Sequence, residues 1–207
     1  YREAVTIMGE GHCRHKKQTG GAGQFAEVYL RVEPLPHDNP HWPLELVDDT
    51  YGGSVPRQFI PAIEKGVRQA LVHGVIAGYP MQGVKVSVYD GKHHPVDSKE
   101  IAFITAGKHA FIDGARKAKP VIMEPFVSLE VSAPASALGA IASDLSSRRG
   151  RIIDTQTLPG GQVLVKATAP LGEVTTYASS LKSMTAGAGS FTMEHSHDEQ
   201  APHDVQQ

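Results

Sequence analysis

The stretch that decides the fold of the first half of the chain is residues 84–119, which read VKVSVYDGKHHPVDSKEIAFITAGKHAFIDGARKAK. Its first six residues alternate valine with Lys, Ser and Tyr, the period of two that is typical of a half-buried strand. The dipeptide Asp90-Gly91 then predicts a turn that ends the strand. Pro95 lacks a backbone donor and prevents the strand from resuming. A histidine-bearing loop is therefore expected at the end of this strand.

A long helix is predicted to follow that loop. Asp97, with Glu100 three residues later, resembles the capping box that begins a helix. Small residues then recur at helical spacing and would let the helix lie close against a sheet. A rigid strand–helix pair would thus hold the loop at its outer end, a common place for functional residues. The stripe comprises Phe103, Ala106, Gly107, Ala110 and Gly114, with Ile104, Phe111 and Ala115 beside it.

The rest of the first half predicts further strands and one more helix. The spacing of Phe25, Val28, Leu30 and Val32 indicates a strand of about ten residues, and residues 44–48 indicate a shorter one. Residues 58–74 show apolar helical spacing that ends at a glycine, as at a helix C-terminus.

The glycine-rich segment 20–23 allows two interpretations. It is either a hairpin turn or a loop whose backbone contacts RNA or phosphate closely. No Lys-Ser or Lys-Thr pair follows it, so a nucleotide-binding P-loop is not expected there.

The second half contains an internal repeat. After Lys119-Pro120, where a helix must end, Ala133-Pro134 recurs as Ala169-Pro170, 36 residues later. Each half predicts a strand, a proline at the first helical turn, an amphipathic helix and another strand. The four strands are 127–131, 152–157, 163–167 and 190–194. This βαββαβ order predicts a ferredoxin-like domain.

Composition limits the class of protein. The chain has 207 residues, 40% hydrophobic and 20% charged, with a formal net charge of −2. Cys13 is the only cysteine, which excludes an internal disulfide and favours a reducing compartment, the cytoplasm. No apolar run approaches the roughly 20 residues of a membrane span, and no signal peptide opens the chain. Because Tyr1 begins inside apparently structured sequence, we expect a fragment of a longer protein.

Charged and histidine clusters give no strong motif by themselves. Basic runs occur at 14–17 and 148–151, where surface charge is the simplest interpretation. The segment 12–15 offers two metal ligands on one strand face, too few for a zinc site. The tail from His195, with His197, Asp198 and His203, is expected to be mobile. We predict no metal site.

Several motifs in one order resemble domains IV and V of bacterial elongation factor G. The most distinctive is Tyr-Asp-Gly-x-x-His-x-Val-Asp-Ser over residues 89–98. The others span residues 18–25, 52–57, 60–66, 78–80, 124–125, 148–152 and 183–185. The resemblance implies an α+β protein: residues 1–119 as a ribosomal-protein-S5-domain-2-like domain with a left-handed βαβ unit, residues 120–199 as the ferredoxin-like domain, and 200–207 as a flexible tail.

The same resemblance implies a part of a ribosome-dependent translation GTPase that moves tRNA and mRNA. GTP and Mg would be bound by an upstream domain, so this chain itself needs no cofactor and is not an enzyme. Domain IV would enter the A site of the small ribosomal subunit, next to 16S rRNA and tRNA–mRNA, and domain V would dock on 23S rRNA at the GTPase-associated centre. A monomer without membrane contact is expected. The implied tip-loop contacts are Gln18, Thr19, Gly20, Gly21, Gly23, Gln24, Lys92, His93, His94 and Asp97. The implied large-subunit contacts are Arg148, Arg149 and Arg151.

Departures from the family pattern keep alternatives open. Ala22 stands where the family commonly has arginine, and Lys-His-His-Pro at 92–95 replaces the usual Ser-Tyr-His-Asp. These changes favour considering a paralogue that acts in ribosome recycling, stress or ribosome protection. A free-standing RNA-binding adaptor and a small histidine- or metal-dependent enzyme remain as further hypotheses, the latter using His12, His15, His93 and His94. Neither a His-Glu-x-x-His motif nor a nucleophile motif supports the enzyme.

Overall fold

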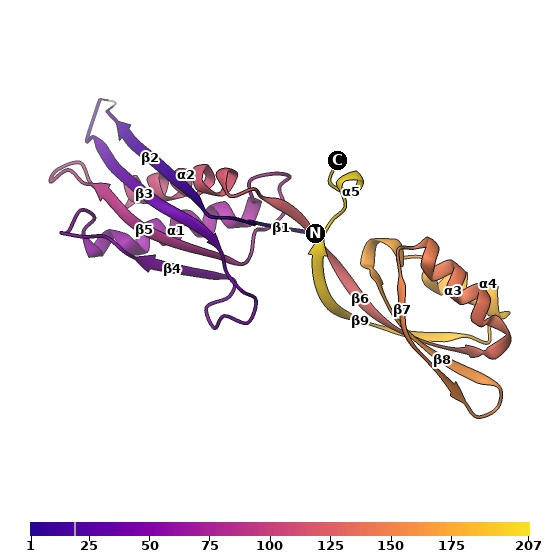
Figure 1. Ribbon diagram of the computed structural model, residues 1–207. Helices are drawn as coiled ribbons and strands as arrows, with labels where there is room; N and C mark the ends of the chain where they lie inside the picture. The colour runs from indigo at the N-terminus through magenta and orange to yellow at the C-terminus, as the bar shows by residue number, and fades with distance from the viewer. Residues whose placement is uncertain (19) are drawn as a thin grey trace. The chain divides into compact units, whose positions relative to one another are not determined.

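The computed structural model describes residues 1–18 and 20–207, and the chain divides into two compact units (Figure 1). The first unit comprises Tyr1–Ile122 with Gln206, and the second Met123–Val205 with Gln207. Each unit has a hydrophobic core of its own. Both mix helices with sheets, so the predicted α+β class is confirmed. No helix in the described ranges is long and apolar enough to cross a membrane.

The first unit is built on a four-stranded sheet of order β2-β3-β5-β4. The strands β2, β3 and β5 are antiparallel neighbours, and β4 runs parallel to β5. Their bounds are β2 Gly9–Lys17, β3 Gln24–Pro34, β4 Leu44–Asp48 and β5 Val84–Lys92, preceded by the short β1 Arg2–Ala4. All the strands predicted from alternation are therefore present.

Two helices pack on one face of this sheet, α1 Ile60–His73 and α2 Glu100–Lys117, with a short 3-10 turn η1 at Arg57–Phe59 before α1. The predicted stripe of small residues is buried along α2. A Cβ on Gly107 would lie 2.9 Å from the Cα of Ile63, and a Cβ on Gly11 would overlap the backbone of α2. Small residues thus let α2 lie close to the sheet at β2, as predicted, and also close to α1.

The turn predicted at Asp90-Gly91 is wrong, because β5 continues to Lys92. The antiparallel partner β3 extends past this point and keeps pairing, with Tyr29 opposite Asp90 and Leu30 opposite Val88. The skipped residue is Tyr89, so the irregularity is a β-bulge rather than a turn. Gly91 is buried where a side chain would overlap the carbonyl of Glu27.

The capping box predicted at Asp97 is also wrong. Helix α2 starts at Glu100, and its N-cap is Lys99, without a side-chain cap. The backbone carbonyl of Asp97 instead accepts a hydrogen bond from the N–H of Phe25 at 3.0 Å. That long-range bond keeps residue 97 out of the helix. It could not be predicted from the spacing of residues near Asp97, because its partner is Phe25 in another strand.

The second unit has the predicted βαββαβ order and the antiparallel strand order β9-β6-β8-β7, which confirms the ferredoxin-like fold. The long strands are β6 Val121–Pro134, β7 Arg151–Leu158, β8 Gln162–Pro170 and β9 Ser190–Gln200. The helices are α3 Leu138–Ser147 and α4 Tyr177–Thr185, each preceded by a 3-10 turn, η2 Ala135–Ala137 and η3 Leu171–Glu173. The repeated prolines, Pro134 and Pro170, are the N-caps of these two turns.

The core of the second unit follows the 36-residue repeat. Ile141 and Leu145 of α3 and their counterparts Tyr177 and Leu181 of α4 are all buried at 1% exposure or less. A glycine C-cap at Gly150 is the simplest expectation for the end of α3, but the left-handed residue is Arg149, with φ 59°. Gly150 N donates to the Leu145 carbonyl at 2.8 Å, which completes a Schellman-type end.

The tail expected from His195 is instead part of the sheet. Strand β9 runs to Gln200, and both His195 and His197 pair with β6. The reason is the length of β6, which offers partners as far as Met123. Beyond β9, Ala201 is buried and a short helix α5 covers His203–Gln206.

Candidate nucleic-acid interface

Two loops meet at the outer end of the first unit: the β2–β3 connection and the β5–α2 loop at residues 93–99 (Figure 1). The hydroxyl of Ser98 donates to the carbonyl of Phe25 at 2.8 Å and accepts from the backbone N–H of His94 at 2.7 Å. Together with the bond from Phe25 N to Asp97 O, these contacts fasten the loop to the start of β3. A Cβ on Gly23 would lie 3.0 Å from the Asp97 carboxyl carbon, so the loops also pack closely.

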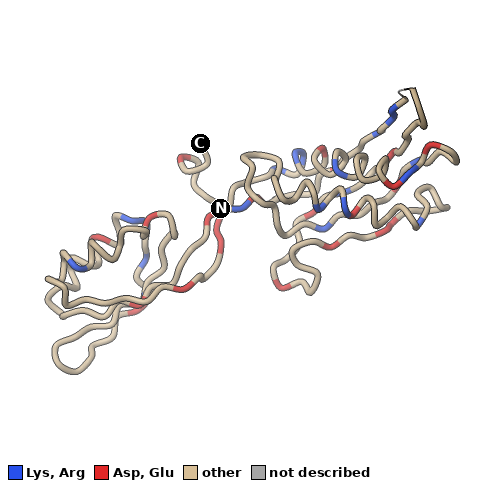
Figure 2. Tube along the Cα trace, turned by 180° about the vertical axis from the view of Figure 1, so that it is seen from behind, with Lys and Arg blue, Asp and Glu red and all other residues tan. Residues whose placement is uncertain are grey.

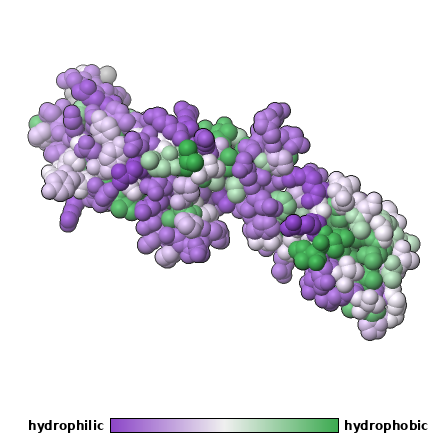
Figure 3. All heavy atoms as spheres, in the orientation of Figure 1, coloured by the Kyte–Doolittle hydropathy of each residue, from purple (hydrophilic) through white to green (hydrophobic). Residues whose placement is uncertain are grey.

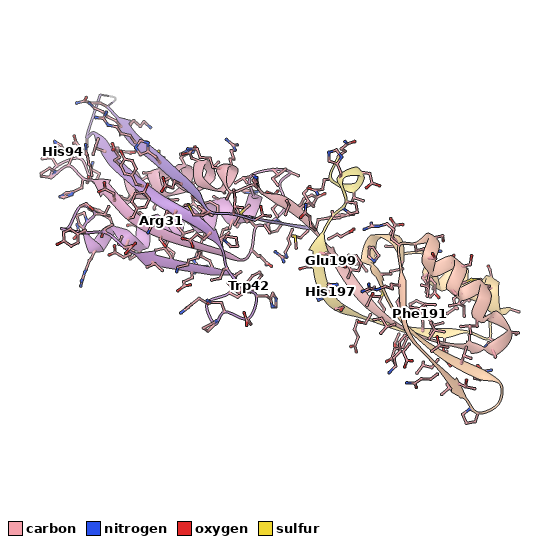
Figure 4. All side chains as sticks on the ribbon, viewed as in Figure 1. Arg31, Trp42, His94, Phe191, His197 and Glu199 are labelled. Atoms are coloured by element: carbon pink, nitrogen blue, oxygen red, sulfur yellow. The ribbon has the colours of Figure 1, made fainter. Side chains whose placement is uncertain are left out.

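His94 is exposed, as predicted, and stands at the outer end of the unit, far from Trp42 (Figure 4). Its Nδ1 accepts hydrogen bonds from the backbone N–H groups of Val96 and Asp97, both at 3.2 Å. A ring nitrogen that accepts carries no proton, so the neutral ring holds its hydrogen on Nε2. His94 therefore shapes its own loop with one nitrogen and can donate to a partner with the other.

Gln24 is oriented by His15, a residue that the sequence analysis considered only for a metal site or an enzyme. The Nε2 of His15 and the Oε1 of Gln24 are 2.9 Å apart. An amide oxygen only accepts, so His15 is the donor and the NH₂ of Gln24 can donate elsewhere. The hairpin brings the pair together, because β2 and β3 pair with Lys17 opposite Gln24 and His15 opposite Ala26.

A cleft of about 470 Å³ lies between these loops and strands. Its charged lining is predominantly basic, since Asp97 is the only acid among the described residues that line it. The side-chain ammonium groups of Lys16, Lys17 and Lys92 make no hydrogen bond or ion pair to the part of the chain that the structure describes. Figure 2 marks cations in blue near this end, and its surface is largely hydrophilic (Figure 3). The lining residues are Arg14, Lys16, Lys17, Gln18, Gly23, Gln24, Phe25, Lys92, His93, His94 and Asp97.

Most residues implied by the resemblance lie at this cleft. Gly20 and Gly21 lie exposed in the adjoining connection without lining it, and Thr19 is outside the described residues. Arg14, Lys16, Lys17 and Phe25 were missed as site residues. For the three cations the signal was the basic run at 14–17, which directly precedes Gln18 and which had been interpreted as surface charge.

The arginines implied as large-subunit contacts have different surroundings. Arg148 is mostly buried and bound within the unit. Its partners are the Asp144 carboxylate, the Glu173 carbonyl and the hydroxyls of Thr176 and Ser180. Arg149 pairs with the buried carboxylate of Glu124, which raises the pKa of the guanidinium. Arg151 is exposed, so it is the arginine of the three that is most available to a partner.

Within residues 1–18 and 20–207, no group of three or more His, Cys, Asp or Glu side chains could hold a metal ion. The exposed side chains of His12 and His93 have local partners instead, Glu27 at 3.5 Å and the Ser54 carbonyl at 3.3 Å. A metal-dependent enzyme therefore has no assembled centre among the described residues.

Comparison with known proteins identifies relatives of both units. The family model described as elongation factor G, domain IV, matches residues 1–119, and the elongation factor G C-terminus model matches 121–207. Elongation factor G of Aquifex pyrophilus is 42% identical over 205 residues, 99% of this chain and 29% of that protein. An elongation factor G-like protein of Thermotoga maritima is 43% identical over 207 residues, 100% of this chain and 30% of its own length. A crystal structure of a Thermus thermophilus protein superposes with a TM-score of 0.88 at 39% identity, covering 99% of this chain and 30% of that one.

Proposed function

The chain belongs to the elongation factor G family, and from this premise we propose that it is the RNA-contacting part of a ribosome-dependent translation GTPase that moves tRNA and mRNA. It spans about 30% of the relatives' length. GTP and Mg²⁺ belong to a GTPase domain outside these residues, so the chain works by contact rather than by chemistry. It acts in the cytoplasm as a monomer.

The observation that carries the proposal is the basic cleft shared by the two tip loops. Lys16, Lys17 and Lys92 are free to pair with phosphate oxygens, which dominate protein–nucleic acid affinity. The Nε2–H of His94 and the NH₂ of Gln24 are donors that suit 2′-hydroxyls and phosphates. Such contacts recognise the shape of an RNA rather than its base sequence, which suits a factor that must move every tRNA.

The two units have separate partners in this proposal. The first unit enters the A site of the small ribosomal subunit, where its tip meets tRNA–mRNA and 16S rRNA. The second unit docks on 23S rRNA at the GTPase-associated centre. Its exposed Arg151 is the proposed phosphate contact there, whereas Arg148 holds α3 to the η3–α4 segment.

The test is single-round translocation by the full-length protein on purified ribosomes. His94→Ala should slow translocation severalfold while ribosome-stimulated GTP hydrolysis is unchanged, because His94 is exposed at the tip and the proposed GTPase domain lies outside these residues. Unchanged translocation with a melting temperature several degrees lower would show that His94 is only structural.

A second candidate is a paralogue that splits or protects ribosomes. It is favoured by the match to a protein named elongation factor G-like, at 43% identity beside 42% for an elongation factor G. Ala22 and the Lys-His-His-Pro segment at 92–95 also depart from the family pattern. A full-length protein that never translocates, but splits ribosomes with a recycling factor, would identify this role.

A further inference from the structure

The connection between β4 and α1, residues 49–57, lies at the same end of the first unit as the tip cleft (Figure 1). Because β4 and β5 are parallel, with Asp48 opposite Val88, the chain leaves both strands in the same direction. We call residues 49–57 the third loop. The sequence motif at 52–57 marked this segment without assigning it a role.

The third loop is anchored to strands β3 and β5 near both its ends. At its start, Asp49 N donates to the Val88 carbonyl at 2.8 Å, and the Asp49 carboxylate pairs with Arg31 at 2.7 Å. Towards its end, Val55 is 1% exposed, and its side chain lies where a Cβ on Gly91 would collide with it. The middle of the loop therefore lies between two segments that are held to the sheet.

One contact makes the third loop continuous with the cleft. The Nδ1 of His93 and the carbonyl oxygen of Ser54 are 3.3 Å apart, and His93 also lines the cleft. A carbonyl only accepts, so Nδ1 is the donor. An RNA strand lying in the cleft against His93 would reach the third loop next.

The exposed part of the third loop has the chemistry of a nucleotide contact. Tyr51 is 94% exposed. It is followed by Gly52 and Gly53, with φ of 66° and 74°, and nothing lies within 4 Å of a Cβ built on either. The backbone is thus open to close approach. Arg57 is also exposed, and its guanidinium makes no hydrogen bond or ion pair to any described residue.

We propose that the third loop is an additional RNA-contacting element, in which Tyr51 stacks on an unpaired base and Arg57 binds a backbone phosphate. This inference rests on the proposed function and extends its contact surface beyond the two tip loops. Aromatic stacking tolerates any base, which matches the shape-based recognition of the cleft. A loop that carries both an unpaired guanidinium and an exposed ring favours RNA over a protein partner, because phosphates supply the complementary charge.

Photocrosslinking tests the placement. The full-length protein, carrying p-benzoylphenylalanine at position 51 or at position 94, is bound to purified ribosomes with a non-hydrolysable GTP analogue. Binding is checked by pelleting. The inference expects RNA crosslinks from both positions. RNA crosslinks from position 94 alone, with none or only protein crosslinks from 51, would overturn the third-loop inference and leave the proposed function standing. Pelleted protein that crosslinks to RNA from neither position would overturn both.

Substitutions test the chemistry. Tyr51→Ala should raise the Kd for ribosomes about fivefold, whereas Tyr51→Phe, which keeps the ring face, should stay within about twofold of the parent. Val72→Ala, at an exposed position on α1, is the control and should leave the Kd unchanged. Equal affinities for Tyr51→Ala and Val72→Ala would overturn the stacking role. Because Tyr51 is nearly fully exposed, its substitution should not affect folding.

Discussion

The hydroxyl of Ser98 donates a 2.8 Å hydrogen bond to the backbone carbonyl of Phe25, across a separation of 73 residues. The same hydroxyl accepts from the N–H of His94. One small side chain therefore connects the β5–α2 loop to the strand that follows the glycine-rich connection. The two tip loops are consequently expected to keep a fixed spacing, as a rigid contact surface requires.

Ser98→Ala should lower the free energy of unfolding by about 1 kcal/mol, because a part-buried carbonyl and an N–H lose their shared partner. The His94 amide should also exchange with solvent faster. Urea unfolding and hydrogen exchange measure the two effects. Ser98→Thr keeps the hydroxyl and serves as the control. An alanine variant with unchanged stability and unchanged exchange would show that the loops are held by other contacts.

His94→Asn should separate the two roles of the ring. The asparagine Oδ1 can accept from the N–H two residues on, so it can replace Nδ1 as the acceptor for Val96. It cannot replace the outward Nε2–H in the same geometry. We expect His94→Asn to slow translocation as much as His94→Ala, while keeping the Val96 amide protected from exchange. Full translocation activity in the asparagine variant would exclude Nε2–H as an RNA contact.

Ile141→Ala should destabilise the second unit by roughly 2–5 kcal/mol, the usual cost of a cavity in a packed core. Ile141 is 0% exposed, at the centre of the 36-residue repeat. Residues 121–200 should fold alone, because β9 runs to Gln200 and completes that sheet. Ser143→Ala, on the exposed side of α3, is the matched control. A loss below about half a kcal/mol for Ile141→Ala would contradict the core assignment.

Tyr177→Phe should leave the second unit as stable or make it more stable. Tyr177 is 0% exposed, and its hydroxyl has no hydrogen-bond partner among the described residues. Removing an unsatisfied buried group removes its desolvation cost. Unfolding at pH 7 measures the difference, and a clear loss of stability would reveal a partner for the hydroxyl.

The same variant should change the alkaline behaviour. Burial raises the pKa of Tyr177 to about 12, from 10. Between these values the unfolded tyrosine loses its proton and the folded one keeps it, so stability falls as the pH rises from 10 towards 12. Tyr177→Phe should lose less stability over that range, by at most about 1.4 kcal/mol per pH unit. If the free energy of unfolding fell equally with pH in the two proteins, the raised pKa of Tyr177 would be contradicted.

The purified 207-residue chain should not bind GTP, because it contains no Gly-x-x-x-x-Gly-Lys-Ser/Thr element. A fluorescent GTP analogue is the direct measurement. Micromolar binding that excess GTP abolishes would contradict this expectation.

Local patterns in the sequence were sufficient for the elements of both units. Alternating valines identified β5, helical spacing identified α1 and α2, and the 36-residue repeat identified the ferredoxin-like unit. These features are set by side-chain periodicity within a few residues or by repetition. Local patterns failed at the element ends: the Tyr89 bulge, the start of α2, the left-handed Arg149 and the length of β9 each depend on a partner elsewhere in the chain.

The sequence by itself therefore determined the elements, their order and the histidine loop, and its motifs carried the family resemblance. Only the tertiary structure decided which residues form the cleft. Sheet pairing brought the basic run of β2 and Lys92 of β5 to the same cleft, placed His15 against Gln24 and put Ser98 against Phe25. The physical reason is distance along the chain. A hydrogen bond between residues 25 and 98 does not alter the hydrophobic periodicity of either segment, because the two residues meet only once the sheet has formed.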